Sequence, residues 1–279
     1  MSTVFNQTQT HAQEKNLSYR NLERARSRMD GQSDTLQQAL QHQCRERCHH
    51  EAREWQLDAA EAFLSGLDCT ILAGTGFGKS LPFTMPSFVK TDDVLIVLAP
   101  LNSLEEDQVR RCEKMGLSAI AVNHETYSED VHASLLRREY QVIYTSPEMA
   151  IENLRFNGLL RSQDYHDRLN GVVVDEAHCI VQWGGYFRPA YSKLDKLRSF
   201  VPHHIPIYAT SATMTPAVLA CTMAFATSPK TLCGFPSLTE ERECTKGCSR
   251  PISQGRIENF ICDKVEPPED NNHPIKTLV

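Results

Sequence analysis

The sequence lacks an excess of positive charge, and it lacks any long hydrophobic run. Its 279 residues include 29 Lys and Arg against 35 Asp and Glu, which gives a net charge of −6. This balance disfavours a protein that binds nucleic acid through bulk positive charge, although it leaves room for a local basic patch. No apolar run is long enough to span a bilayer, and the polar first thirteen residues contain no stretch typical of a secretory signal.

Paired cysteine motifs are also missing. The ten cysteines are scattered, and none forms a CxxC pair. Without a secretion signal, this pattern favours reduced thiols in a cytosolic or nuclear compartment. Zinc is not expected, because neither Cys44 and Cys48 with the histidines after them nor the cysteines of the last fifty residues have paired zinc-ligand spacing. Cysteines beside apolar segments are expected to be core thiols, and these are Cys69, Cys112 and Cys179.

What is present is the composition of a globular protein, with 41% hydrophobic and 23% charged residues. Three zones differ in composition. Residues 1–50 form a polar leader, expected to be a solvated helix or disordered. Residues 51–225 alternate apolar runs with amphipathic stretches, and residues 226–279 lose this rhythm and are expected to be an irregular tail.

The middle zone predicts an α/β fold. Short apolar runs typical of buried strands occur at 69–73, 94–100, 118–122, 141–145, 171–175 and 206–209. Helical patterns are predicted at 51–64, 103–115 and 129–138. Buried strands that alternate with helices indicate a parallel sheet flanked by helices, whose ligands bind beyond the carboxyl ends of the strands.

A glycine-rich segment follows the first of these strands: Ala73, Gly74, Thr75, Gly76, Phe77, Gly78, Lys79 and Ser80. Glycines allow backbone amides to face inward and hold phosphate oxygens. Lys79 is predicted to reach the β- and γ-phosphates, and the Ser80 hydroxyl to bind Mg²⁺. The strict phosphate-loop pattern has glycine where this chain has Ala73. The alternative is a glycine-rich turn with a solvated lysine.

Two acids end another apolar strand, in the sequence Val172-Val173-Val174-Asp175-Glu176. Asp175 is placed to hold Mg²⁺, and Glu176 to orient and deprotonate an attacking water. His178 is predicted to sense the γ-phosphate. The alternative is an exposed strand end with solvated charges. The phosphate loop 96 residues earlier favours the nucleotide site.

These motifs resemble, in order along the chain, those of the RecQ-like DNA helicases of superfamily 2. The matching segments are Arg53 with Gln56, 75–80, 99–108, 144–148, 175–179 and Ser211-Ala212-Thr213. The aromatic-rich segment from Gln182 to Tyr191 is the most diagnostic. The resemblance covers residues from about 52 to 216 and implies a RecA-like P-loop NTPase domain.

The resemblance also implies roles for individual residues. Arg53 and Gln56 read the adenine, Ser211 and Thr213 couple hydrolysis to motion, and ATP with Mg²⁺ is the cofactor. In the family the aromatic-rich loop reports single-stranded DNA to the ATP site. Here the expected DNA-contacting residues are Trp183, Phe187 and Arg188, since flat rings stack on bases and a guanidinium binds phosphate.

Two features depart from the family. Gly185 and Tyr186 stand where the loop usually has a histidine and an acidic residue. Only about 65 residues follow Thr213, fewer than a second RecA-like lobe with its arginine finger requires. The expectation is therefore the ATP-binding lobe of a 3′–5′ RecQ-type helicase that does not unwind DNA alone.

The partners implied are single-stranded or forked DNA and a separate second lobe or full-length helicase, with no membrane. Nuclear placement follows from the family analogy alone. The alternative function is a non-catalytic module that binds ATP and single-stranded DNA. For Trp183 and Phe187, the alternative to DNA contact is that both rings pack in the core, as most aromatic residues do. A GTPase or small-molecule kinase is poorly supported, because no Asn-Lys-x-Asp motif follows the phosphate loop.

Overall fold

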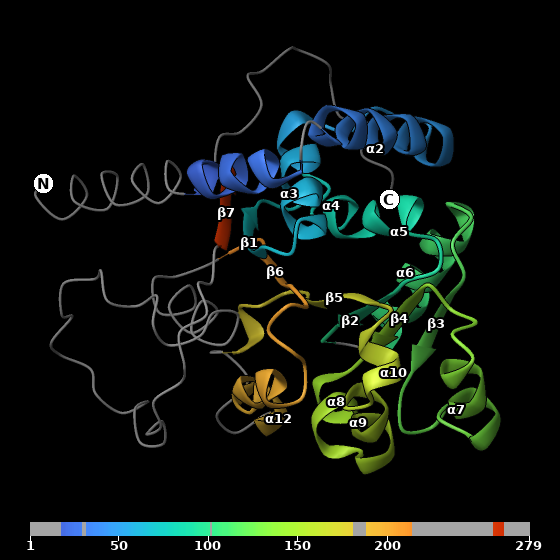
Figure 1. Ribbon diagram of the computed structural model, residues 1–279. Coiled ribbons are helices and arrows are strands. Elements are labelled where there is room, and N and C mark those ends of the chain that lie inside the picture. The colour runs from blue at the N-terminus through green and yellow to red at the C-terminus, as the bar shows by residue number, and fades with distance from the viewer. Residues whose placement is uncertain (1–17, 30–31, 101, 181–187, 214–258, 265–279) are drawn as a thin grey trace, which may run out of the picture.

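The structure, a computed structural model, describes residues 18–29, 32–100, 102–180, 188–213 and 259–264. They build one parallel sheet in the order β3-β4-β2-β5-β6-β1-β7 (Figure 1). The strands are β1 (Asp68–Ala73), β2 (Val94–Leu98), β3 (Ala119–Val122), β4 (Val142–Thr145), β5 (Leu169–Val174), β6 (Ile207–Ser211) and β7 (Asn259–Lys264). Within the described ranges, no helix is long and apolar enough to cross a membrane.

Helices cover both faces of the sheet (Figure 1). One layer contains a helix over residues 18–28, α2 (Gln32–Cys48), α3 (Glu54–Leu64), α4 (Leu81–Thr84), α5 (Pro86–Val89) and α6 (Asn102–Lys114). The other contains α7 (Glu129–Leu136), α8 (Pro147–Glu152), α9 (Leu154–Leu160), α10 (Gln163–His166), α12 (Pro189–Ser192) and the 3₁₀ helix η1 (Leu194–Ser199). The predicted parallel sheet flanked by helices is confirmed. All six predicted strands are present within two residues of their expected bounds.

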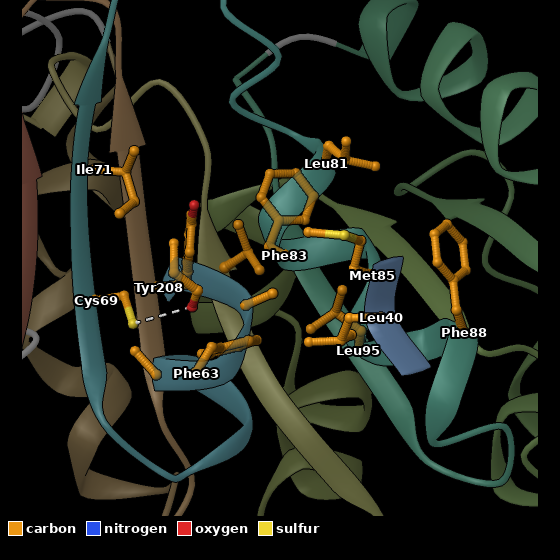
Figure 2. Close-up of a cluster of buried hydrophobic side chains, with 14 of the residues drawn as sticks. Leu40, Phe63, Cys69, Ile71, Leu81, Phe83, Met85, Phe88, Leu95 and Tyr208 are labelled. Carbon is orange, nitrogen blue, oxygen red and sulfur yellow. Dashed lines mark hydrogen bonds between the residues drawn. The ribbon is translucent and has the colours of Figure 1, made fainter. Parts of the chain in front are cut away.

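The first core layer explains why α3 forms where the apolar pattern predicted it. Trp55, Ala59 and Phe63 recur at helical spacing and are buried against the sheet. Figure 2 shows Phe63 and Tyr208 among the buried side chains of this layer, and their rings meet edge to face at 5.4 Å. Gly171 of β5 is required for this contact, because a Cβ there would lie 2.2 Å from the Phe63 ring.

The described part of the leader is helical, but it is not simply solvated as expected. Leu22, Leu40 and Cys44 are fully buried, and α2 contacts α3 and α5. Figure 2 shows Leu40 of α2 among the core side chains. Three apolar positions among many glutamines and arginines predict a buried helix only weakly. They suffice for burial here because the apolar surface of α3 and α5 is available for these side chains to cover.

The prediction of a wholly irregular tail also needs correction. Asn259–Lys264 forms β7 and pairs in parallel with β1, with Cys69 opposite Phe260. The short run Phe260-Ile261-Cys262 is apolar enough to form a strand, and pairing covers the edge of β1 that would otherwise be open.

Candidate nucleotide site

Three strand ends bring the predicted site residues to one edge of the sheet. The phosphate loop follows β1, the two acids follow β5, and Ser211 ends β6, which lies between them. The register places Leu72 opposite Ser211 and Val174 opposite Ala209. Because all these strands are parallel, their carboxyl ends share this edge.

The phosphate loop is a tight turn that depends on its glycines. Gly76 and Gly78 have φ angles of +85° and +76°, a region that favours glycine. The amide of Phe77 donates to the carbonyl of Gly74 at 3.3 Å, and α4 begins one residue after Ser80 with Pro82 in its first turn. Proline is tolerated at this position because no amide donor is lost there.

Lys79 lies across this turn. Its Nζ donates to the carbonyl of Gly74 at 3.4 Å, so the side chain folds back over the loop that it would share with a phosphate. Thr75 and Gly76 are exposed at the tip of the loop, and Ser80 is half-buried at the start of α4. The loop therefore presents its backbone and one ammonium to the same space.

Gln56 and Arg53, at the start of α3, lie against the loop. The Gln56 Nε2 donates to the carbonyls of Phe77 at 3.2 Å and Gly78 at 3.1 Å, and its Oε1 accepts from the Arg53 amide at 2.8 Å. The Arg53 guanidinium lies 5.4 Å from the centre of the Phe77 ring. The Gln56 carboxamide is thus bound to the loop backbone itself, and its expected reading of adenine stays a prediction.

The acidic strand end holds a charge that its surroundings do not compensate. The Asp175 amide donates to the Leu98 carbonyl at 2.9 Å, and its Oδ1 accepts from the Glu176 amide at 3.0 Å. Burial, followed by the charge of Glu176, raises the pKa of Asp175 to about 6, while the ammonium of Lys79 acts in the opposite direction. The charge of Lys79 therefore acts on the buried Asp175 carboxyl at this edge of the sheet.

A hydrogen-bonded chain links the acids to β6. His178 Nδ1 lies 3.1 Å from Glu176 Oε2 and 2.8 Å from Ser211 Oγ. Ser211 Oγ donates to the Thr213 carbonyl at 2.8 Å and accepts from the Thr213 amide at 3.2 Å. Since Ser211 uses its own proton on Thr213 and a carboxylate only accepts, Nδ1 of His178 is the donor in both contacts.

A family model described as DEAD/DEAH box helicase matches residues 53–220. The chain belongs to this family. The matched helicase segment begins at the start of α3 and includes every strand from β1 to β6. It also includes both halves of the nucleotide site.

The similar proteins place this helicase domain beside the RecQ group, which confirms the predicted relationship. The ATP-dependent DNA helicase RecQ of Pasteurella multocida is 35% identical over 164 residues, which are 58% of this chain and 25% of that protein. The ATP-dependent DNA helicase Q-like SIM of Arabidopsis thaliana is 32% identical over 174 residues, 58% of this chain and 20% of that protein. The chain thus spans a quarter or less of the length of these two relatives.

A solved structure shows the same fold. Dbp5 of S. cerevisiae, bound in that structure to ADP among other partners, matches with a TM-score of 0.53 at 17% identity. The match covers 67% of this chain and 49% of that chain. The RecA-like fold predicted for the helicase domain is confirmed.

The predicted DNA-contacting residues are only partly described. Trp183 and Phe187 lie outside the described residues. The guanidinium of Arg188 donates to Glu148 through Nε at 2.7 Å and through a second nitrogen at 2.5 Å, and it also donates to the Pro100 carbonyl. Although burial opposes it, these bonds lower the pKa of Glu148. In this helicase domain Arg188 therefore ties three strand-end segments together.

Sequence reasoning missed a cavity of about 420 Å³ beside the loop, lined by α2, α4 and α6. Gln56, Gly78 and Ser80 form one side of it. The other side includes Arg47, His49, His50, Arg111 and Lys114, and no carboxylate is among its described lining residues. The sequence Cys48-His49-His50 was the signal that could have indicated this cavity, but its spacing alone suggested half of a metal site. In the described part of the chain, no three His, Cys, Asp or Glu side chains cluster as metal ligands.

The raised pKa of Asp175 predicts that its charged carboxylate lowers the free energy of unfolding. A carboxyl whose pKa is raised on folding destabilises the fold as the pH rises from about 4 through 6, and the cost is complete above 6. Without nucleotide, Asp175→Asn is expected to increase the free energy of unfolding at pH 8 by about 1–3 kcal/mol. The gain should shrink at pH 5. Urea denaturation at both pH values measures it.

Asp107→Asn is the control, since Asp107 is exposed, forms an ion pair with Arg110, and has a carboxyl whose pKa is lowered by that pair. It should not raise stability at pH 8. An Asp175→Asn protein that is less stable than the parent at pH 8 would contradict the assignment of an uncompensated carboxylate.

Proposed function

We propose that this chain binds and hydrolyses ATP as the nucleotide lobe of a RecQ-type DNA helicase with 3′–5′ polarity. Membership of the helicase family supports ATP-dependent activity and DNA binding. One observation carries the proposal most directly: the glycine turn with Lys79 and the strand end with Asp175 lie at the same carboxyl edge of the sheet, where the charge of Lys79 acts on the buried Asp175 carboxyl. A triphosphate would pair with the ammonium of Lys79, and a divalent cation would pair with the carboxylate of Asp175.

The loop residues hold the phosphates in this proposal. The backbone amides of 74–78 and the ammonium of Lys79 bind the β- and γ-phosphate oxygens. Ser80 and Asp175 hold Mg²⁺, and the pKa of Asp175 near 6 supports the fit, since a buried carboxylate gains most from a nearby cation. Mg²⁺ neutralises charge that develops on the phosphate oxygens.

Glu176 and His178 act on the far side of the phosphates. Glu176 orients the attacking water and accepts its proton, and it follows Asp175 in a turn with φ of +50°, which directs its side chain beside that of His178. His178 then transmits the state of the site through Ser211 to Thr213. This series of hydrogen bonds ends at Thr213, just after β6.

Single-stranded or forked DNA is the proposed nucleic-acid partner, with Trp183 and Phe187 stacking on bases and Arg188 binding phosphate. A second RecA-like lobe, supplied by another polypeptide or by further sequence, is the proposed protein partner, because ATP between two lobes gains an arginine from the second. Nuclear localisation belongs to the same proposal and rests on the RecQ resemblance.

The test is ATP binding and turnover by the 279-residue polypeptide, with and without single-stranded DNA. A fluorescent ATP analogue measures binding, and phosphate release measures turnover. We expect Mg²⁺-dependent binding, slow turnover that DNA increases, and no strand separation. Binding without turnover at any DNA concentration would instead assign a non-catalytic module. Failure to bind ATP would reject both functions.

A further inference from the structure

Two helices outside the family-matched segment pack on α3, the helix that contacts the phosphate loop. The helix over residues 18–28 and α2 precede residue 53, where the family match begins. Both reach the core, since Leu22 and Leu40 are each 0% exposed. This helical pair, residues 18–48, therefore forms part of the same packed layer as α3 and the phosphate loop.

A buried ion cluster fixes the pair to α3. The guanidinium of Arg26 donates to Glu61 Oε2 through Nε at 3.1 Å and through a second nitrogen at 2.8 Å, and to Asp58 Oδ1 at 2.7 Å. Gln37 Nε2 donates to Glu61 at 2.7 Å and to Asp58 at 3.3 Å, and Ser33 donates to Glu61. These five residues are the Arg26 cluster.

Burial and attraction oppose one another in this cluster, since burial raises the pKa of Asp58 although the hydrogen bond and the charge of Arg26 act to lower it. Glu61 is 0% exposed, and Asp58 is buried. Burial lowers the pKa of Arg26, but its hydrogen bonds and the charges of the carboxylates raise that pKa overall. Without Arg26, two carboxylates on one face of α3 would remain buried beside each other without a cation, which favours movement of α3 toward solvent.

Movement of α3 would be felt at the phosphate loop. Gln56 lies two residues before Asp58 on the same helix, and its carboxamide holds the carbonyls of Phe77 and Gly78. The fit is close, because a Cβ at Gly78 would lie 2.7 Å from Gln56 Nε2. A small shift of α3 therefore either breaks these bonds or moves the backbone that faces the phosphates.

The pair is anchored at its other end too. Arg47 donates to the carbonyls of Met115 at 3.1 Å and Gly116 at 3.2 Å, which closes the C-terminus of α6. The His49 and His50 that follow line the cavity beside Gly78 and Ser80. The helical pair thus spans the side of the nucleotide site from α3 to α6.

We propose that Arg26 is a positioning residue for nucleotide binding, acting through α3 and Gln56 on the phosphate loop. The inference rests on the proposed function, since it concerns affinity for ATP. Arg26→Gln is expected to weaken Mg-ATP binding by about tenfold at temperatures well below its unfolding midpoint. The triple variant R26Q/D58N/E61Q, which removes both buried charges as well, should return the affinity to within about threefold of the parent.

Arg198→Gln is the matched control for a merely structural effect. Arg198 pairs with the buried Asp68 at the start of β1, the end of that strand opposite the phosphate loop. R198Q should lower the unfolding midpoint and leave ATP affinity unchanged. A milder variant, Gln37→Ala, removes two amide bonds to the same carboxylates and should weaken ATP binding by about threefold.

The outcomes separate the two proposals. If the parent protein does not bind ATP, the proposed function fails. If the parent binds and R26Q binds equally well, or loses affinity only as much as R198Q does, the role of Arg26 is rejected and the function stands. Should R26Q be unfolded, Q37A decides, and unchanged affinity in Q37A overturns the inference.

Discussion

Replacing Lys79 with alanine is expected to abolish ATP turnover and to weaken Mg-ATP binding by about 100-fold or more. The ammonium of Lys79 is the cation of the loop, and its charge acts on the Asp175 carboxyl. Without it, the phosphates would meet Asp175 and Glu176 with only backbone amides to balance them. Phosphate release and titration with a fluorescent ATP analogue measure the two losses.

Lys90→Ala is the matched control for this change. Lys90 follows α5 in the same region of the chain and forms a distant ion pair with Asp93 at 3.9 Å. It should leave both turnover and affinity unchanged, and circular dichroism should show that both variants fold. Wild-type turnover in Lys79→Ala would reject the loop as the phosphate site.

Glu176→Gln is expected to separate binding from chemistry. The amide keeps the size of the side chain but cannot accept a proton from water, so turnover should fall by about 10²–10⁴-fold. Affinity for Mg-ATP should stay within about threefold of the parent, because Lys79, Ser80 and Asp175 are unchanged. Single-turnover phosphate release together with equilibrium binding gives both numbers.

Glu139→Gln provides the comparison, since Glu139 is exposed and pairs with Arg137 far from the carboxyl edge. It should hydrolyse ATP as the parent does. Equal loss of affinity and turnover in Glu176→Gln would assign Glu176 to nucleotide binding and leave the water without its proposed base.

The fold was predictable because its signals are local. Val94–Leu98 is a continuous apolar run of strand length, and the apolar segment 172–174 runs directly into Asp175 and Glu176, so a buried parallel sheet was the direct interpretation. The glycines of the phosphate loop and the acids after β5 are equally local. Their meeting at one edge follows from parallel strands alone.

The remaining features depend on contacts between distant segments. Nothing near Arg26 in the sequence indicates that its partners lie on a helix 32 and 35 residues away. In the same way, nothing near Arg188 in the sequence indicates its ion pair with Glu148 of α8, and its predicted contact with DNA stays a prediction. A side chain with several donors takes whichever acceptor the tertiary structure supplies, and the sequence does not name that acceptor.

Because β6 lies between β1 and β5, it sets the distance between the phosphate loop and the two acids. Two strand spacings separate the end of β1 from the end of β5, which is about 10 Å. A nucleoside monophosphate seated on the glycine turn ends short of the acids, while a triphosphate with its metal ion bridges the distance. For the proposed ATP site, this spacing therefore predicts weaker binding of a nucleoside monophosphate than of a triphosphate.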